Sequence, residues 1–525
     1  MTKSVVYKFL TVFLCLIFFT NYIFAQISVE YFGGAGRVSG SCALLKVGDN
    51  SVIIDCGSFY DEGDLPSDNA TIDKKLINAD AMVLTHAHND HSGRILQLIN
   101  EGFKGNIYCT DATKKILLEM YDDGWNYDYV KKKYFWSKTK REKMQLRESK
   151  ENLTLHWHSA CKNAVKNREE SKTEISPVQL KDKYGINFKV CKNCLNKDLE
   201  KLQDRFISVE YKDNIDITDK INFSLYDAGH ISGSSSVIFY IYDDNKIKTV
   251  AFSGDLGSGY SKITPDKDII PKVDYIFVET TYGGVKKDVS SADYQKFQET
   301  ISNAVKNDKI VWIPSLSLHR TQKVLFEIKQ AQINGLIPYD VPVYSLSPSS
   351  NGITERYEKE ANFPSRDRWF KNEVYQIGSF LPENYITKKP KEFPVPSIII
   401  SASGMMDQGV SYGLINKLLP LENVEVCLVS YVGPKTPAGK LKKGAKHIRT
   451  TYGTAKVAAK VNVFDIFSDH PDIDELMKWL SNQDSSTKIY LVHGDKDILD
   501  KALILYKQKG FENTKIAVKG INVLN

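Results

Sequence analysis

Short apolar runs alternate with amphipathic stretches along most of the chain, and their spacing predicts a layered α/β fold. The runs at 52–54, 81–84, 221–225, 275–278 and 489–492 are short and rich in β-branched residues, as buried strands are. We therefore expect an αββα sandwich whose first part is residues 26–285 and whose second part is residues 426–525.

A second rhythm of strands and helices lies between these two parts. Strands are expected at 310–313, 341–344 and 398–400, and a helix at 320–330, where Val324, Leu325 and Ile328 share one face. This pattern predicts a smaller α/β cap domain over residues 286–425, inserted into the sandwich.

Residues of metal-binding types follow the strand expected at 81–84, where residues 85–91 read THAHNDH. His86 and His88 are two positions apart at a strand end and can face one ion, while Asp90 and His91 can serve a second. Zinc takes such nitrogen and oxygen ligands. Four unpaired polar side chains beside a buried strand would otherwise be costly, so the pattern favours a metal site over a structural His-rich loop.

Other strand ends supply the missing ligands. His230 follows the run at 221–225 and can act as a third imidazole for the first ion. Asp255 follows another apolar strand, and a carboxylate there can bridge two cations about 3.5–4 Å apart. Asp55 ends the run at 52–54, where we expect it to orient a ligand imidazole.

The string formed by His86, His88, Asp90 and His91 resembles the signature of the metallo-β-lactamase superfamily. Glu279, His470 and His493 follow further strands in the order of motifs A, B and C of the β-CASP branch. That branch comprises nucleic-acid-cutting nucleases such as the pre-mRNA 3′-end endonuclease and bacterial RNase J. The resemblance covers nearly all of residues 27–525, and it implies a metallo-β-lactamase sandwich with a β-CASP-like cap.

The resemblance implies two zinc ions at the active site, with His493 among the ligands, and hydrolysis of RNA by metal-activated water. Glu279 would orient His470, which would donate a proton to the leaving oxygen. In the resembled family a His at motif C is found in RNA-cutting members, so we expect single-stranded RNA as the partner; a homodimer stays an open alternative. The expected substrate contacts, all in β-CASP-like segments, are Arg320, Ser403 and Tyr431.

Two departures from the family pattern leave these substrate contacts open. Residues 284–287 read GVKK after motif A, and His319 stands where the family has a Gly before its Arg. Two alternatives also stay open: a hydrolase of another ester or small molecule on the same metal core, and a non-catalytic RNA-binding relative. The apolar cap disfavours the first alternative, and the complete ligand set disfavours the second.

Composition fits a soluble globular protein of more than one domain. The 525 residues are 42% hydrophobic and 26% charged, and the net charge is +6. This mildly basic net charge permits phosphate binding in a local groove, but it is too small for a strongly positive surface like that of a histone.

The N-terminal segment has the features of a secretory signal peptide. Lys3 and Lys8 precede an apolar run at 9–19, and Ala25 closes the segment. We expect residues 1–25 to be removed and the mature protein to be periplasmic or secreted, without permanent membrane association. The apolar stretch at 9–25 is near the lower limit for spanning a bilayer, so an N-terminal membrane anchor is the alternative.

A charged segment at about 121–215 is expected to be an insertion arm that carries a Cys/His cluster. His158, Cys161, Cys191 and Cys194 have a spacing close to that of a structural zinc site, which would be a third zinc. His156 competes as the fourth ligand. Because an exported chain can form disulfides, a disulfide or free thiols remain alternatives.

Overall fold

The computed structural model describes residues 26–60, 69, 71–122, 192–243, 246–287, 289–361 and 381–524. The expected signal segment at 1–25 and most of the Cys/His cluster, including His158, Cys161 and Cys191, lie outside these ranges. Cys194 belongs to helix α10 (Lys192–Gln203), in a part whose side chains are not described. Within the described ranges, every helix is too short or too polar to cross a lipid bilayer.

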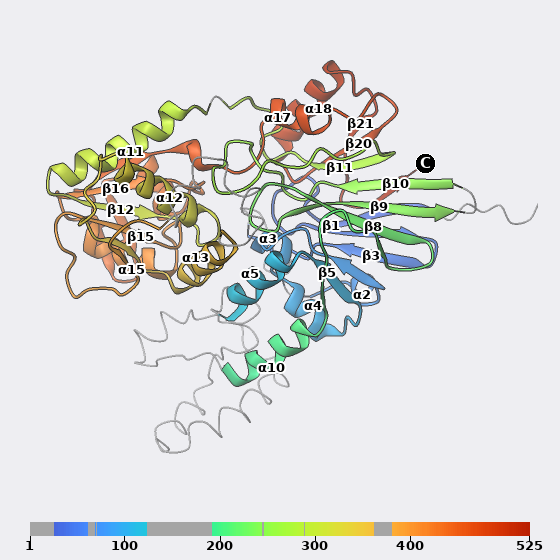
Figure 1. Cartoon of the computed structure of the whole chain (residues 1–525), viewed down its shortest axis with the longest axis horizontal. Coiled ribbons are helices and arrows are strands. Elements are labelled where there is room, and N and C mark those ends of the chain that lie inside the picture. Colours follow the sequence, from blue (N-terminus) through green and yellow to red (C-terminus); the bar gives the residue numbers. More distant parts are fainter. Residues whose placement is uncertain are drawn as a thin grey trace, which may run out of the picture.

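Two seven-stranded sheets form the centre of the larger lobe, on the right in Figure 1. In spatial order, the first sheet consists of β22 (Gly520–Leu524), β1 (Ile27–Gly33), β2 (Cys42–Val47), β3 (Asn50–Ile54), β4 (Ala81–Val83), β5 (Asn106–Cys109) and β6 (Phe206–Ser208). The second consists of β21 (Thr514–Ile516), β20 (Lys488–Val492), β11 (Tyr275–Glu279), β10 (Lys246–Phe252), β9 (Ser235–Asp243), β8 (Ile221–Asp227) and β7 (Ile215–Asp216). Their facing sides share one core, in which Val29 and Leu45 lie with Phe223, Phe239 and Phe277.

Helices cover the outer face of each sheet. The first sheet is covered by α2 (Lys74–Ile77), α4 (Ile95–Glu101) and α5 (Asp111–Asp122), and α3 (Asn89–Ser92) lies at its carboxyl edge. The second is covered by α17 (Ile473–Trp479) and α18 (Lys496–Gln508), from which Trp479 and Tyr506 are buried against Ile276 and Ile489. The layer order is therefore helix, sheet, sheet, helix, which confirms the predicted αββα sandwich.

A six-stranded parallel sheet forms the smaller lobe, on the left in Figure 1. Its spatial order is β14 (Tyr385–Ile386), β13 (Val343–Ser345), β15 (Ser397–Ser401), β12 (Ile310–Pro314), β16 (Val424–Leu428) and β19 (Lys460–Val463). Side chains alternate across β12, so Val311 and Ile313 face α11 (Ser291–Lys306), α12 (Arg320–Ile333) and α13 (Pro348–Ala361). Ile310 and Trp312 face α15 (Gly409–Leu418) and α16 (Pro437–Lys442).

The α/β cap is thus present, but it extends beyond the expected boundary at residue 425. β16 and β19 both belong to the cap sheet, and the chain rejoins the sandwich only after Val463, through the short helix η2 (Asp465–Phe467). An apolar strand such as β16 fits either sheet by its sequence, so only its tertiary pairing with β12 reveals the difference. The strand expected from 341 begins at Val343, because Pro342 has no N–H to donate.

Candidate metal centre and active site

The loop after β4 carries the first candidate ligands, and Asp55 holds this loop in place. Asp55 directly follows β3 and accepts hydrogen bonds from the backbone N and the Oγ1 of Thr85, both at 2.8 Å. Its Oδ2 also lies 2.7 Å from Nδ1 of His91. Asp55 therefore lies behind His91 and fixes the orientation of its ring, so that Nε2 points into the centre.

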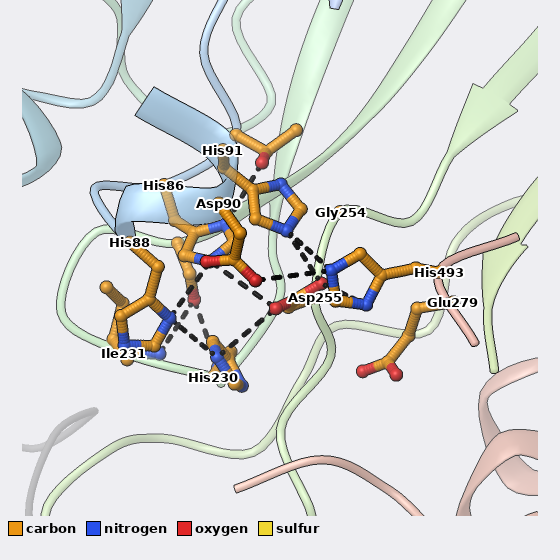
Figure 2. A network of polar contacts seen from close by, with 12 residues as sticks. His86, His88, Asp90, His91, His230, Ile231, Gly254, Asp255, Glu279 and His493 are labelled. Atoms are coloured by element: carbon orange, nitrogen blue, oxygen red, sulfur yellow. Dashed lines mark hydrogen bonds and ion pairs between the residues drawn. The ribbon is translucent and has the colours of Figure 1, made fainter. Parts of the chain in front are cut away.

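Three imidazoles and one carboxylate form the first group that could hold a metal ion: His86, His88, His230 and Asp255. The ring nitrogens crowd together, since Nδ1 of His88 lies 3.1 Å from Nε2 of His86 and 3.2 Å from Nε2 of His230 (Figure 2). Oδ2 of Asp255 completes the group at 3.5 Å from Nε2 of His86. A cation among these lone pairs would satisfy all of them at once.

The second group consists of Asp90, His91, His493 and again Asp255. Nε2 of His91 lies 3.1 Å from Nε2 of His493 and 3.1 Å from Oδ1 of Asp255. Asp255 thus turns Oδ2 toward the first group and Oδ1 toward the second (Figure 2). Among the described residues, Oδ1 of Asp255 is buried without a hydrogen-bond partner, which fits a carboxylate built to bridge two cations.

The electrostatics of the first group suit ligation, whereas in the second group, against the lowering effect of burial, Asp255 and Asp55 raise the pKa of His91 well above its usual value. Burial, with the neighbouring imidazoles, lowers the pKa of His88 to about 3 and that of His230 to about 4. Burial alone would raise the pKa of Asp255, but His493 and His91 more than offset it and hold the pKa well below the usual value. Neutral imidazoles and an ionised carboxylate are the forms that bind metals.

Glu279 and His470 form a pair beside this centre. Oε1 of Glu279 lies 3.0 Å from Nδ1 of His470 and accepts a hydrogen bond from the backbone N of Leu256. Burial lowers the pKa of His470, but the charge and hydrogen bond of Glu279 outweigh it and raise the pKa to about 9. Nδ1 of His470 is 4.0 Å from Oδ2 of Asp255, so the pair adjoins the carboxylate shared by both groups.

Sequence reasoning missed a buried ion pair that joins the cap to the metal centre. Nζ of Lys323, on α12, lies 2.5 Å from Oδ1 of Asp469, and Arg320 and His319 lie within 3.6 Å of the same carboxylate. The carbonyl of Asp469 is 3.3 Å from Nδ1 of His230. Asp469 neighbours His470 in the sequence, but its partner is 146 residues away, so only the fold could reveal the pair.

A second connection between the lobes passes through Tyr357 of α13. The Tyr357 hydroxyl accepts a hydrogen bond from the backbone N of Ser232 at 3.2 Å and lies 3.1 Å from Nδ1 of His319. Ser232 belongs to the loop that carries His230. The cap therefore contacts the metal-site loops directly, and nothing in the local sequence around Tyr357 signals this role.

The three expected substrate contacts lie at the carboxyl ends of the cap strands and outside both ligand groups. Arg320 donates to the carbonyl of Val429 and contacts Asp469, so its guanidinium is bound within the protein. Ser403 donates to Asp407 at 2.6 Å, and the side chain of Tyr431 is exposed.

Comparisons with known proteins agree with this architecture. The sequence model of the Metallo-beta-lactamase superfamily matches residues 35–309, that of the Beta-Casp domain matches 321–441, and that of the Zn-dependent metallo-hydrolase RNA specificity domain matches 454–514. A solved structure titled as a protein of unknown function from Enterococcus faecalis V583 superposes over 95% of this chain and 100% of its own. Its TM-score is 0.50 at 12% identity, which is a likeness in fold alone.

Relatives of similar sequence carry names connected with RNA. The transcription termination factor FttA of Methanosarcina mazei is 26% identical over 93% of this chain and 70% of its own length. An RNase J-like protein of Methanocaldococcus jannaschii is 26% identical over 92% of this chain and 96% of the relative's length. A ribonuclease of Thermus thermophilus is 24% identical over 89% of this chain and 93% of the relative's length. With its sandwich, its cap and its metal-binding His and Asp clusters, the chain belongs to the β-CASP branch of the metallo-β-lactamase superfamily.

Proposed function

We propose that this protein is a ribonuclease that hydrolyses single-stranded RNA with two zinc ions. The observation that carries the proposal is the shared carboxylate of Asp255, whose two oxygens face separate clusters of imidazoles beside the Glu279–His470 pair. The relatives named as ribonucleases support RNA as the substrate.

One zinc would be held by His86, His88, His230 and Asp255, and the other by Asp90, His91, His493 and Asp255. When bound, such a pair supplies a water of lowered pKa as the nucleophile and positive charge for the phosphate. The protein's own part is to fix these ligands. Asp55 accepts a hydrogen bond from Nδ1–H of His91, which leaves Nε2 of that ring for the ion.

Proton transfer to the leaving oxygen falls to His470. Glu279 accepts the hydrogen bond from Nδ1–H of His470, so Nε2–H remains to be donated to the leaving 3′ oxygen. A pKa raised to about 9 keeps this imidazole protonated at neutral pH. His470 thus acts as the general acid, and Glu279 as the group that orients and charges it.

Two parts of the proposal concern residues that, apart from Cys194 in α10, lie outside the described ranges. Residues 1–25 would direct export and be removed, so the enzyme would meet RNA outside the cytoplasm. His158, Cys161, Cys191 and Cys194 would bind a third, structural zinc in the insertion arm.

The function is tested with end-labelled single-stranded RNA and DNA, each with and without a chelator, together with the zinc content of the purified protein. We expect RNA cleavage that the chelator abolishes. Asp255→Ala should lower zinc occupancy and abolish hydrolysis, whereas Asp500→Ala, on the exposed side of α18, should change neither. An Asp255→Ala protein that keeps its zinc and its full activity would refute the ligand assignment.

A further inference from the structure

The segment between Glu425 and Asp465 is strongly basic. It contains seven lysines and one arginine but no Asp or Glu. Its excess of eight cations is larger than the net charge of +6 carried by the whole chain. The positive charge of this protein is therefore concentrated in one part of the cap.

A β-hairpin in this segment presents its cations on one face. It consists of β17 (His447–Thr450) and β18 (Gly453–Lys456), in which Ile448 pairs with Ala455 and His447 pairs with Lys456. Ile448 and Ala455 are buried in the cap core that includes α15. Because side chains alternate across a strand, Arg449 and Lys456 project from the opposite, exposed face.

Most of these cations are not neutralised by acids. Lys442 pairs with Asp465 at 3.1 Å, and Lys460 pairs with Glu425 at 3.2 Å. The exposed cations on and beside the hairpin that form no ion pair with any carboxylate in the described part of the chain are Lys443, Lys446, Arg449 and Lys456. An exposed face with such an excess of one charge attracts polyanions.

Aromatic rings accompany the positive charge. Tyr452 lies at the hairpin turn and is 53% exposed, and its ring centroid is 6.1 Å from that of Tyr412 on α15. The Tyr412 hydroxyl accepts a hydrogen bond from the backbone N of Thr451 and so fixes the turn. An exposed ring beside cations is the combination with which proteins bind single-stranded nucleic acid.

The hairpin is connected to the carboxyl edge of the cap sheet through α15. α15 is anchored there, since the backbone N of Ser411 donates to the carbonyl of Ala402, next to Ser403. Arg320 ties the end of β16 at Val429 to Asp469, the neighbour of His470. The first turn of α15 therefore contacts both the loop after β15 that carries Ser403 and, through Tyr412, the turn of the hairpin.

We propose that the β17–β18 hairpin, with Lys446, Arg449, Tyr452 and Lys456, is an RNA-docking surface for the part of a single strand that lies beyond the cleavage site. Its cations would bind backbone phosphates, and Tyr452 would stack on a base. A lipid surface fits less well, because the apolar side chains of the hairpin face inward. The inference rests on the proposed ribonuclease function and names where that enzyme holds a long substrate.

The test compares two triple variants of the full-length protein that lose the same charge. One is Lys446→Gln, Arg449→Gln and Lys456→Gln, and the control is Lys507→Gln, Lys515→Gln and Lys519→Gln, which changes exposed lysines near α18 and β21. Binding of a long, fluorescently labelled phosphorothioate RNA is measured by anisotropy over a range of salt concentrations. Each phosphate contact with a single strand contributes about 0.7 to the slope of log affinity against log salt. In the hairpin variant we expect the magnitude of that slope to fall by about 2 and the affinity at 0.1 M salt to fall on the order of 10²-fold. The control should keep the slope and the affinity of the unaltered protein.

The aromatic contribution is measured separately. Tyr452→Ala should weaken RNA binding about tenfold, while Tyr452→Phe, which keeps the ring, should not. A hairpin variant that binds RNA as tightly as the control overturns the proposal. The proposal is also overturned if the hairpin variant keeps its RNA affinity but loses binding to phosphatidylserine vesicles, because the hairpin would then be a membrane-binding surface. If the unaltered protein cleaves no RNA, the ribonuclease function fails, while the binding comparison still decides whether this hairpin docks RNA.

Discussion

Removal of the Lys323 charge should show how strongly the cap supports the metal centre. In Lys323→Met, the side chain keeps a similar length but loses its ion pair with Asp469. At 2.5 Å and an effective dielectric constant of 20, that attraction is about 7 kcal/mol. The variant also avoids the cost of desolvating the lysine charge, which offsets several kcal/mol of the lost attraction. Arg320 and His319 still contact Asp469, so we expect a net loss of about 3 kcal/mol in the free energy of unfolding.

The effect is measured by urea unfolding, together with the zinc content and RNA cleavage of the folded protein. Because the carbonyl of Asp469 lies 3.3 Å from Nδ1 of His230, a loosened Asp469 should also weaken metal binding. Lys329→Met is the matched control, as Lys329 lies on the same helix but pairs with Glu383, whose side chain is 59% exposed. That change should cost at most about 1 kcal/mol.

A double-mutant cycle isolates the pair itself. Lys323→Met combined with Asp469→Asn leaves no buried carboxylate to be neutralised, so the double variant should be less destabilised than the two single changes together. Strict additivity, or a Lys323→Met protein as stable as the unaltered one, would show that this contact does not join the cap to the sandwich.

Three further predictions concern other parts of the molecule. His470→Ala should keep both zinc ions but lose roughly 10²- to 10⁴-fold in rate, and a collapse in zinc content would instead make His470 a ligand. Alkylation of the native protein should spare Cys161, Cys191 and Cys194 until a chelator is added, whereas release by a reductant alone would indicate a disulfide. N-terminal sequencing should find a mature start near Gln26; a start at Met1 in the membrane fraction would indicate an anchor.

The layers of the fold and the candidate ligands could be predicted because both follow from local patterns. Each ligand comes just after a short apolar run, so His86, His230 and Asp255 could be named before their distances were known. The contacts between the lobes could not be predicted in this way. Lys323 and Asp469, or Tyr357 and Ser232, are far apart in the chain, and neither partner has a local pattern that requires the other.

The extent of the cap was missed for a related reason. β16 is an apolar strand, and its five residues are equally compatible with the sandwich and with the cap. Its membership is decided by parallel pairing with β12 and β19, which depends on residues more than a hundred positions upstream and on a strand downstream. Local pattern thus identified the strand but not its sheet.

The order of the ligands along the chain determines when the enzyme can become active. His86, His88, His230 and Asp255 all precede the cap, whereas His470 and His493 follow it, and β22 completes the first sheet by pairing with β1. During synthesis, a partial chain could at most assemble the first group of ligands. The second group, the proposed proton donor His470 and the closing strand β22 all need residues that are made after the cap. A nascent chain that has not yet extended past the cap therefore cannot cut the RNA of the ribosome that makes it, because half of its catalytic centre has not been synthesised.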